Sequence, residues 1–126
     1  MKVKHYRELL VWQKSMELTK AIYQITSGFP NDELYGLTSQ MRRCAVSVPS
    51  NIAEGHNRDS IKDYLRFLSI AQGSLAELET QVSLAQLMDY IAKIKETQLL
   101  QRANEIGKML RGLQLKLHEK ILEPSP

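Results

Sequence analysis

Apolar residues recur along most of the chain at intervals of three and four, the spacing that places them on one side of an α-helix. Four segments follow this pattern, at about residues 6–27, 32–55, 60–89 and 95–118. The third has the longest stripe, which consists of Ile61, Tyr64, Leu68, Ala71, Leu75, Leu78, Val82 and Ala85. Heptad-like spacing of this kind is typical of helices that pack at shallow angles in bundles. The pattern therefore predicts four long amphipathic helices.

The first segment has two apolar stripes that lie side by side. One contains Leu9, Trp12, Met16, Thr19 and Tyr23, and the other contains Val11, Leu18, Ile22 and Ile25. Together they predict a helix with a wide apolar face. Gly28 and Pro30 follow, and a glycine with a proline close behind it is typical of a helix end.

The second segment begins after Asn31 or Asp32, either of which is a good N-cap, and it contains Pro49. A proline inside a helix costs about 3 kcal/mol and leaves one carbonyl without its hydrogen bond. The apolar stripe nevertheless keeps its phase across Pro49. We therefore predict one helix that is kinked at Pro49 rather than two helices.

The connections between the segments are short. Ser60 or Asp59 is the expected cap of the third helix, and a break is expected near residues 89–90. Helices joined by short loops pack as antiparallel neighbours. We predict an all-α fold, an up-down-up-down antiparallel four-helix bundle that forms a single domain over residues 1–126. A disordered tail is expected at about residues 122–126.

Composition and charge add two limits to this picture. The chain has 17 Lys and Arg residues against 14 Asp and Glu, a net charge of +3, which permits nucleic-acid contact without requiring it. The only cysteine, Cys44, excludes an internal disulfide and fits a reducing compartment. The sequence shows neither a signal-peptide pattern nor an apolar run long enough to span a membrane. We expect a cytoplasmic protein without a membrane partner.

The outer sides of the second and third predicted helices have small residues where a monomeric bundle would have long charged ones. Small residues allow a second backbone to approach, and a glycine inside a helix, such as Gly73, costs about 1 kcal/mol relative to Ala. Such a glycine often has a packing reason, although it can also simply be tolerated. We predict a subunit interface in a symmetric homo-oligomer. Its candidate residues are Arg43, Ser47, Ser50, Glu54, Arg66, Ile70, Gly73 and Glu77.

One end of the predicted bundle collects positive charge, because the N-terminus, the connection between the second and third helices and the C-terminus meet there. In an oligomer this charge would repeat around one rim, where it could hold a phosphate backbone without reading its sequence. The alternative is an ordinary solvated end. The candidate nucleic-acid contacts are Lys2, Lys4, Arg7, Arg58, Lys62, Arg111, Lys116 and Lys120.

Sequence patterns for catalysis or metal binding are missing. No glycine-rich phosphate loop, paired-cysteine spacing or His-Glu-x-x-His motif occurs. Ser47, Ser50 and Glu54 share one helix face, but no histidine is placed to complete a triad with them. We therefore expect no enzyme, no catalytic residue, no cofactor and no metal site.

Several motifs resemble those of the bacterial four-helix-bundle proteins that are encoded in intervening sequences of 23S ribosomal RNA genes. They occur at residues 10–14 (LVWQK), 33–37 (ELYGL), 40–55 (QMRRCAVSVPSNIAEG), 64–68 (YLRFL), 71–80 (AQGSLAELET) and 107–110 (GKML). The resemblance covers nearly the whole chain. The motif at residues 40–55 is the most specific, because a generic bundle does not require it.

The resemblance implies a homopentamer in the bacterial cytoplasm and a role in nucleic-acid binding. A branch with a similar fold is the accessory protein of diversity-generating retroelements, a basic pentamer that binds RNA and reverse transcriptase. The resemblance thus favours a non-enzymatic protein that binds nucleic acid, RNA in particular, or acts as an accessory protein. The alternative is a protein–protein interaction scaffold with no nucleic-acid role.

Overall fold

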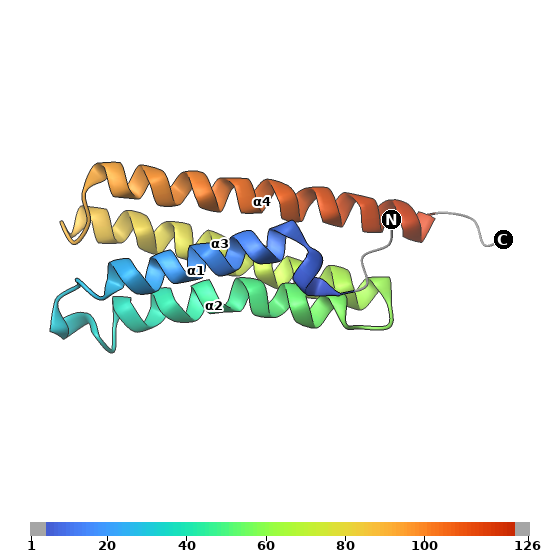
Figure 1. Ribbon diagram of the computed structural model, residues 1–126, viewed down its shortest axis with the longest axis horizontal. Helices are drawn as coiled ribbons and strands as arrows, with labels where there is room; N and C mark the ends of the chain where they lie inside the picture. Colours follow the sequence, from blue (N-terminus) through green and yellow to red (C-terminus); the bar gives the residue numbers. More distant parts are fainter. Residues whose placement is uncertain (1–4, 123–126) are drawn as a thin grey trace.

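The computed structural model describes residues 5–122, and this part of the chain contains helices and no strand. The four helices are α1 (Leu10–Thr26), α2 (Leu37–His56), α3 (Ile61–Leu87) and α4 (Lys93–Leu122). Figure 1 shows that the chain reverses its direction at each of the three connections between them. The prediction of an all-α fold with four long helices is confirmed.

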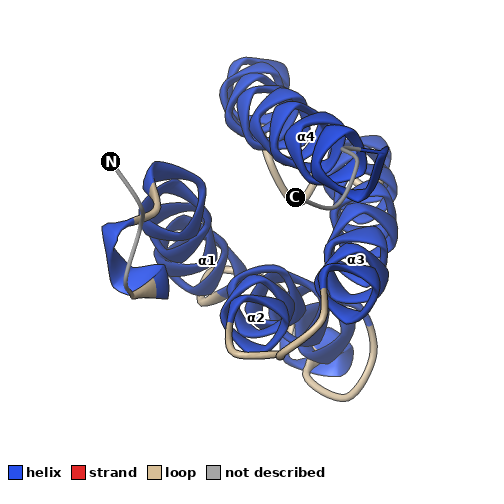
Figure 2. Cartoon of the chain, turned by 90° about the vertical axis from the view of Figure 1, so that its right-hand side faces the viewer, coloured by secondary structure: helices blue, strands red, loops and turns tan. Residues whose placement is uncertain are grey.

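Viewed end-on, the helices form an open arc in the order α1, α2, α3 and α4 (Figure 2). One apolar core lies along the inside of this arc and receives side chains from all four helices. Its fully buried members include Ile22, Met41, Ile52, Leu68 and Leu110. Six residues of the long predicted stripe in α3 are buried, namely Leu68, Ala71, Leu75, Leu78, Val82 and Ala85.

The helix starts differ from the predicted ones at two places. Residues Tyr6–Glu8 form a separate 3-10 turn, η1, and Leu9 is extended, so α1 begins at Leu10 rather than at residue 6. A second turn, η2 (Asn31–Glu33), precedes α2, which begins at Leu37 rather than at residue 32. The predicted cap at Asn31 or Asp32 is therefore wrong.

The cap of α2 comes from a residue that the sequence did not single out. A side-chain oxygen of Glu33, Oε1, accepts a hydrogen bond of 3.2 Å from the backbone N–H of Leu37. Of the two caps expected for α3, the structure has Ser60, whose hydroxyl accepts a hydrogen bond of 3.1 Å from the backbone N–H of Asp63. At the C-terminus, α4 continues to Leu122. The rest of the predicted tail, residues 123–126, lies outside the described residues.

α2 and α3 pack closely because small residues line their contact. α2 is one helix from Leu37 to His56 and includes Pro49. The hydroxyl oxygens of Ser47 and Ser74 lie 2.8 Å apart across the contact. Near the end of α2, a Cβ atom on Gly55 would lie only 2.8 Å from Cβ of Phe67. Gly55 is thus required for this close approach.

The connection between α1 and α2 is fixed to the connection between α3 and α4. The Tyr90 hydroxyl donates a hydrogen bond of 2.7 Å to Oε2 of Glu33, and the rings of Phe29 and Tyr90 lie 5.2 Å apart. This hydrogen bond is the main reason that the pKa of Glu33 lies below and the pKa of Tyr90 above its ordinary value. Both connections lie at the left end in Figure 1, so this contact holds that end of the bundle together.

Candidate nucleic-acid interface

The predicted basic end is the right-hand end of the bundle in Figure 1, where the connection between α2 and α3 and the C-terminal turns of α4 lie. Arg58 and Lys62 belong to that connection and to the first turn of α3. Lys116 and Lys120 are one helical turn apart in α4. Lys2 and Lys4 lie outside the described residues. The candidate interface is therefore carried mainly by the α2–α3 connection and by α4.

Two of the candidate cations are engaged within the chain. The Arg7 guanidinium lies 5.2 Å from the centre of the Trp12 ring and 5.7 Å from that of the Tyr6 ring. Arg58 forms an ion pair of 2.9 Å with Glu54 and also lies 4.9 Å from the Phe67 ring. Because its charge is already compensated, Arg58 has less to offer a phosphate than the sequence suggests.

Four candidates remain available for contact with a polyanion. Their side chains are exposed, and they have no ion-pair partner within residues 5–122. Three of them come from the second half of α4, so that helix provides most of the unpaired charge. The four residues are Lys62, Arg111, Lys116 and Lys120, and they are called the basic end from here on.

The predicted interface residues lie on the outer sides of α2 and α3, and all except Ser47 are exposed. Ser47 is half-buried because it faces Ser74. At Gly73 a Cβ atom would meet nothing within 4 Å, so packing within the chain does not explain the glycine. This surface stays a candidate contact with a second molecule.

Two of the four charged residues of the predicted interface already have charged partners within one chain. Glu54 pairs with Arg58, and Arg66 lies 3.8 Å from Asp63 and 4.5 Å from the Phe67 ring. The other two charged residues of the predicted interface are Arg43 and Glu77. Arg43 has no ion-pair partner within residues 5–122, and Glu77 accepts a hydrogen bond of 3.4 Å from the Cys44 thiol.

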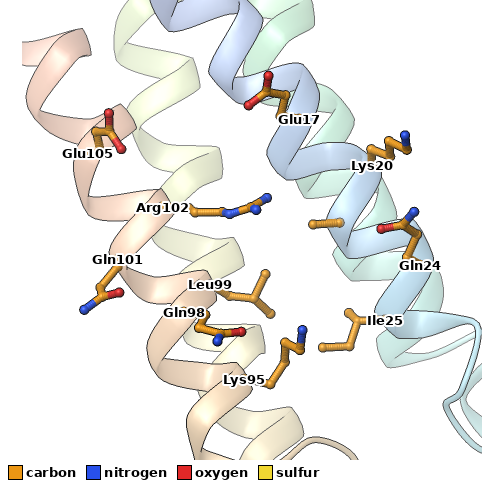
Figure 3. Close-up of a pocket in the computed structure, with 11 residues that line it drawn as sticks. Glu17, Lys20, Gln24, Ile25, Lys95, Gln98, Leu99, Gln101, Arg102 and Glu105 are labelled. Atoms are coloured by element: carbon orange, nitrogen blue, oxygen red, sulfur yellow. The ribbon is translucent and has the colours of Figure 1, made fainter.

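A groove between α1 and α4, with a volume of about 970 Å³, was not predicted. Figure 3 shows Leu99 and Arg102 pointing toward α1 and Ile25 pointing toward α4. An ion pair of 2.9 Å between Lys14 and Glu105 connects the two helices. The charged and amide side chains that line the groove are Glu17, Lys20, Gln24, Lys95, Gln98, Gln101, Arg102 and Glu105. Because two carboxylates accompany the three cations here, the groove has a weaker preference for a polyanion than the basic end has.

Three further features of the described part of the chain concern metal ligands, the one cysteine and membrane crossing. Residues 5–122 contain no group of three or more His, Cys, Asp and Glu side chains that could hold a metal ion. Burial is the main cause that raises the pKa of the Cys44 thiol, which favours the unreactive protonated form. None of the described helices is long and apolar enough to cross a membrane.

Comparison with known proteins gives one family and one fold. The family model described as 23S rRNA-intervening sequence protein matches residues 7–112. Among solved structures, a protein of unknown function from the S23 ribosomal protein family of Bacteroides thetaiotaomicron is similar, with 24% identity and a TM-score of 0.78. The match covers 83% of this chain and 95% of that chain, and it shows a shared fold. No curated protein matches the chain.

Proposed function

The chain belongs to the 23S rRNA-intervening sequence protein family, and on this premise we propose that it is a non-enzymatic homopentamer that binds RNA through its basic end. The observation that carries the proposal is the unpaired charge of Lys62, Arg111, Lys116 and Lys120 at one end of the bundle. The number five is the state that the family resemblance implies. The protein would act in the cytoplasm by holding RNA rather than by transforming it.

Assembly would make the modest positive charge of each chain sufficient for RNA binding. Each phosphate that is neutralised releases condensed counterions, so affinity grows with the number of contacts. One basic end provides only a few contacts. Several copies held together would present their basic ends to the same RNA, and each further contact would form at a high effective concentration.

The absence of catalysis is part of the proposal. Its support is the raised pKa of the Cys44 thiol, the one cysteine of the chain, together with the lack, within residues 5–122, of a group of three or more His, Cys, Asp and Glu side chains that could hold a metal ion. A nucleophile needs a lowered pKa or a neighbouring base. Binding of a polyanion needs only positive charge that is exposed and unpaired.

Binding of a labelled structured RNA by fluorescence anisotropy across a salt series tests the proposal. We expect the logarithm of the affinity to fall linearly with the logarithm of salt concentration. The variant Lys116→Gln/Lys120→Gln should bind more weakly, with a slope that is smaller by about 1 for each lost phosphate contact. Absent binding at low salt, or an affinity that salt leaves unchanged, would contradict the proposal.

The matched control removes two lysines from the opposite half of the bundle. Lys20 and Lys95 are exposed and line the groove between α1 and α4. The variant Lys20→Gln/Lys95→Gln has the same net charge as the Lys116→Gln/Lys120→Gln variant, so only position distinguishes them. An equal loss of affinity in both variants would show that overall charge, and not the basic end, determines binding.

A protein-interaction scaffold is the second candidate, and exposed apolar side chains in the second half of α4 favour it. Leu115 is 62% exposed and Leu122 is 83% exposed. The two leucines are seven residues apart on α4 and so lie on the same side of the helix, and exposed apolar side chains that lie together are typical of contact surfaces. Purification from the native host with and without nuclease distinguishes the two functions. A protein partner that stays bound after nuclease treatment, with no RNA recovered beforehand, would favour the scaffold.

A further inference from the structure

An exposed hollow with a volume of about 520 Å³ lies on the α1–α2 side of the bundle. It is lined by Tyr23, Leu34, Tyr35, Thr38, Ser39, Arg42, Arg43 and Val46, and is called the cationic hollow. Tyr35 is 93% exposed and Leu34 is 51% exposed. Exposed apolar patches mark contact sites, and tyrosine and arginine are enriched at the centres of protein interfaces.

Two arginines give the cationic hollow its charge. Arg42 is held in place, because its Nε donates a hydrogen bond of 2.9 Å to the Thr26 hydroxyl and its guanidinium lies 4.7 Å from the Tyr23 ring. Arg43 is exposed and unpaired within the described residues. Among residues 5–122 no carboxylate lines this hollow, and the nearby Glu33 is occupied by the Tyr90 hydroxyl. The hollow therefore favours an acidic partner.

A second hollow, also of about 520 Å³, lies on the α3–α4 side. It is lined by Glu79, Thr80, Ser83, Leu84, Leu87 and Leu100, and is called the acidic hollow. Leu84 is 45% exposed and Leu87 is 73% exposed. Glu79 has no ion-pair partner within the described residues, and no described cation lines this hollow. Exposed leucines beside an unpaired carboxylate complement the cationic hollow in both polarity and charge.

The two hollows lie at the same end of the bundle but on different sides of it. The cationic hollow borders the connection between α1 and α2, the acidic hollow borders the connection between α3 and α4, and Figure 1 shows both connections at the same end. Figure 2 shows α1 and α4 at opposite ends of the arc. A copy placed beside this one, with its helices parallel, can therefore bring its acidic hollow level with the cationic hollow.

We infer that copies of this chain join head to tail, the cationic hollow of one copy packing against the acidic hollow of the next. The inference rests on the proposed homo-oligomer and names the surfaces that build it. Two hollows of the same charge would repel one another. In a two-fold contact between cationic hollows, Arg42 and Arg43 would face another pair of arginines. An odd-numbered ring cannot consist of two-fold contacts, which join copies in pairs, whereas head-to-tail contacts close into rings.

Three of the eight predicted interface residues, Arg43, Gly73 and Glu77, fit this arrangement. Gly73, Glu77, Thr80, Leu84 and Leu87 follow one another on α3 at intervals of three and four, so Gly73 is on the same side as the acidic hollow. Its missing side chain leaves room for the neighbouring copy. On α2, Arg43 belongs both to the predicted interface and to the cationic hollow.

A charge exchange tests the contact. The single variants Arg43→Glu and Glu79→Arg are expected to shift the protein toward the monomer at a concentration at which the wild type is assembled, as measured by light scattering after size-exclusion chromatography. The double variant Arg43→Glu/Glu79→Arg should regain the assembled mass. Single variants that stay assembled, or a double variant that is as dissociated as the singles, would overturn the inference.

Blocked variants test the head-to-tail order independently of the charge exchange. Tyr35→Asp places a carboxylate in the cationic hollow, where it would face Glu79 of the next copy. Leu84→Lys places a cation in the acidic hollow, where it would face the arginines of the next copy. Both side chains are exposed, so the fold should be preserved. Each variant alone is expected to be monomeric, and an equimolar mixture should form a dimer and nothing larger, because each copy retains one intact hollow. A variant that still assembles alone, or a mixture that stays monomeric, would overturn the inference.

Two further outcomes separate the inference from the proposed function. A monomeric wild type would contradict the proposed homo-oligomer itself. An assembled wild type whose hollow variants also stay assembled would contradict only the assignment of the hollows as the contact surfaces. Arginine and tyrosine also bind RNA by charge and stacking. Loss of RNA affinity in Tyr35→Asp at unchanged mass would show that RNA, and not a second copy, occupies the cationic hollow.

Discussion

Replacing Gly55 by alanine should destabilise the fold, although alanine is the better helix former. Gly55 lies near the C-terminal end of α2, where that helix meets α3. A Cβ atom at this position would lie 2.8 Å from Cβ of Phe67, 3.0 Å from Cδ1 of Tyr64 and 3.2 Å from the backbone oxygen of Tyr64. Contacts below 3.0 Å are repulsive, and neither a Cβ atom nor a backbone oxygen can move away by a simple rotamer change.

Two opposing effects determine the magnitude. Higher helix propensity favours alanine by up to about 1 kcal/mol, and by less in the last turn of a helix. Overpacking of a well-packed contact costs about 1–3 kcal/mol, because α2 and α3 have to separate. We expect a net loss in the free energy of unfolding of about 1–2 kcal/mol. For a domain of this size, that loss would lower Tm by several degrees.

Urea unfolding followed by far-UV circular dichroism, at equal protein concentrations, measures this loss. The control is Gly112→Ala in α4, where a Cβ atom would meet nothing within 4 Å. This variant should gain up to about 1 kcal/mol, since only propensity changes. If Gly55→Ala proved as stable as the wild type while Gly112→Ala gained stability, the close α2–α3 contact would not be the reason for the glycine.

Three further predictions concern stability, pH and assembly. Burial raises the pKa of Tyr64 to about 12, and the buried hydroxyl has no hydrogen-bond partner within residues 5–122. Tyr64→Phe should therefore increase the free energy of unfolding, measured by urea unfolding, by about 1 kcal/mol. A decrease would contradict this. The hydrogen bond from Tyr90 holds the pKa of Glu33 below its ordinary value of 4.5. The stability that the ionised Glu33 contributes is therefore complete above pH 4.5 and is lost as the pH falls through the folded-state pKa. The wild type should have a higher Tm than Glu33→Gln at neutral pH, and this difference should vanish in acid. A Tm difference that does not change with pH would refute the prediction. Gly73→Leu should reduce the assembled mass in light scattering without altering the circular dichroism spectrum, and an unchanged mass would count against an interface at this glycine.

The helices themselves could be predicted because their periodicity is a local property of the sequence. The α3 stripe from Leu68 to Ala85 is buried as expected. In α1, however, two adjacent stripes competed for the core. Val11, Leu18 and Ile22 are buried, whereas Met16 is 44% exposed and Tyr23 is 42% exposed. Which of two neighbouring stripes faces the core depends on where α2 and α4 lie, and that information is not local.

The start of α2 was misplaced for a related reason. Asn31 and Asp32 have the side chains of good caps, but the capping carboxylate belongs to Glu33, and Tyr90 holds it from 57 positions away in the sequence. The compensation of Arg58 has a signal in the sequence. Glu54 lies in the last turn of α2 and Arg58 two residues beyond the end of that helix, so the two are four positions apart, the spacing at which ion pairs form on a helix.

The groove and the two hollows could not be predicted because they depend on the open arc of the four helices. Each hollow is formed by residues from two helices, and its lining appears only when those helices are placed side by side. The arc also gives the proposed assembly a simple consequence. The hollows lie at one end of the bundle and the basic end lies at the other, so contacts made through the hollows alone leave Lys62, Lys116 and Lys120 uncovered. Because rotation about the axis of a ring keeps equivalent residues at one level, the basic ends of all copies would meet the same RNA from one side.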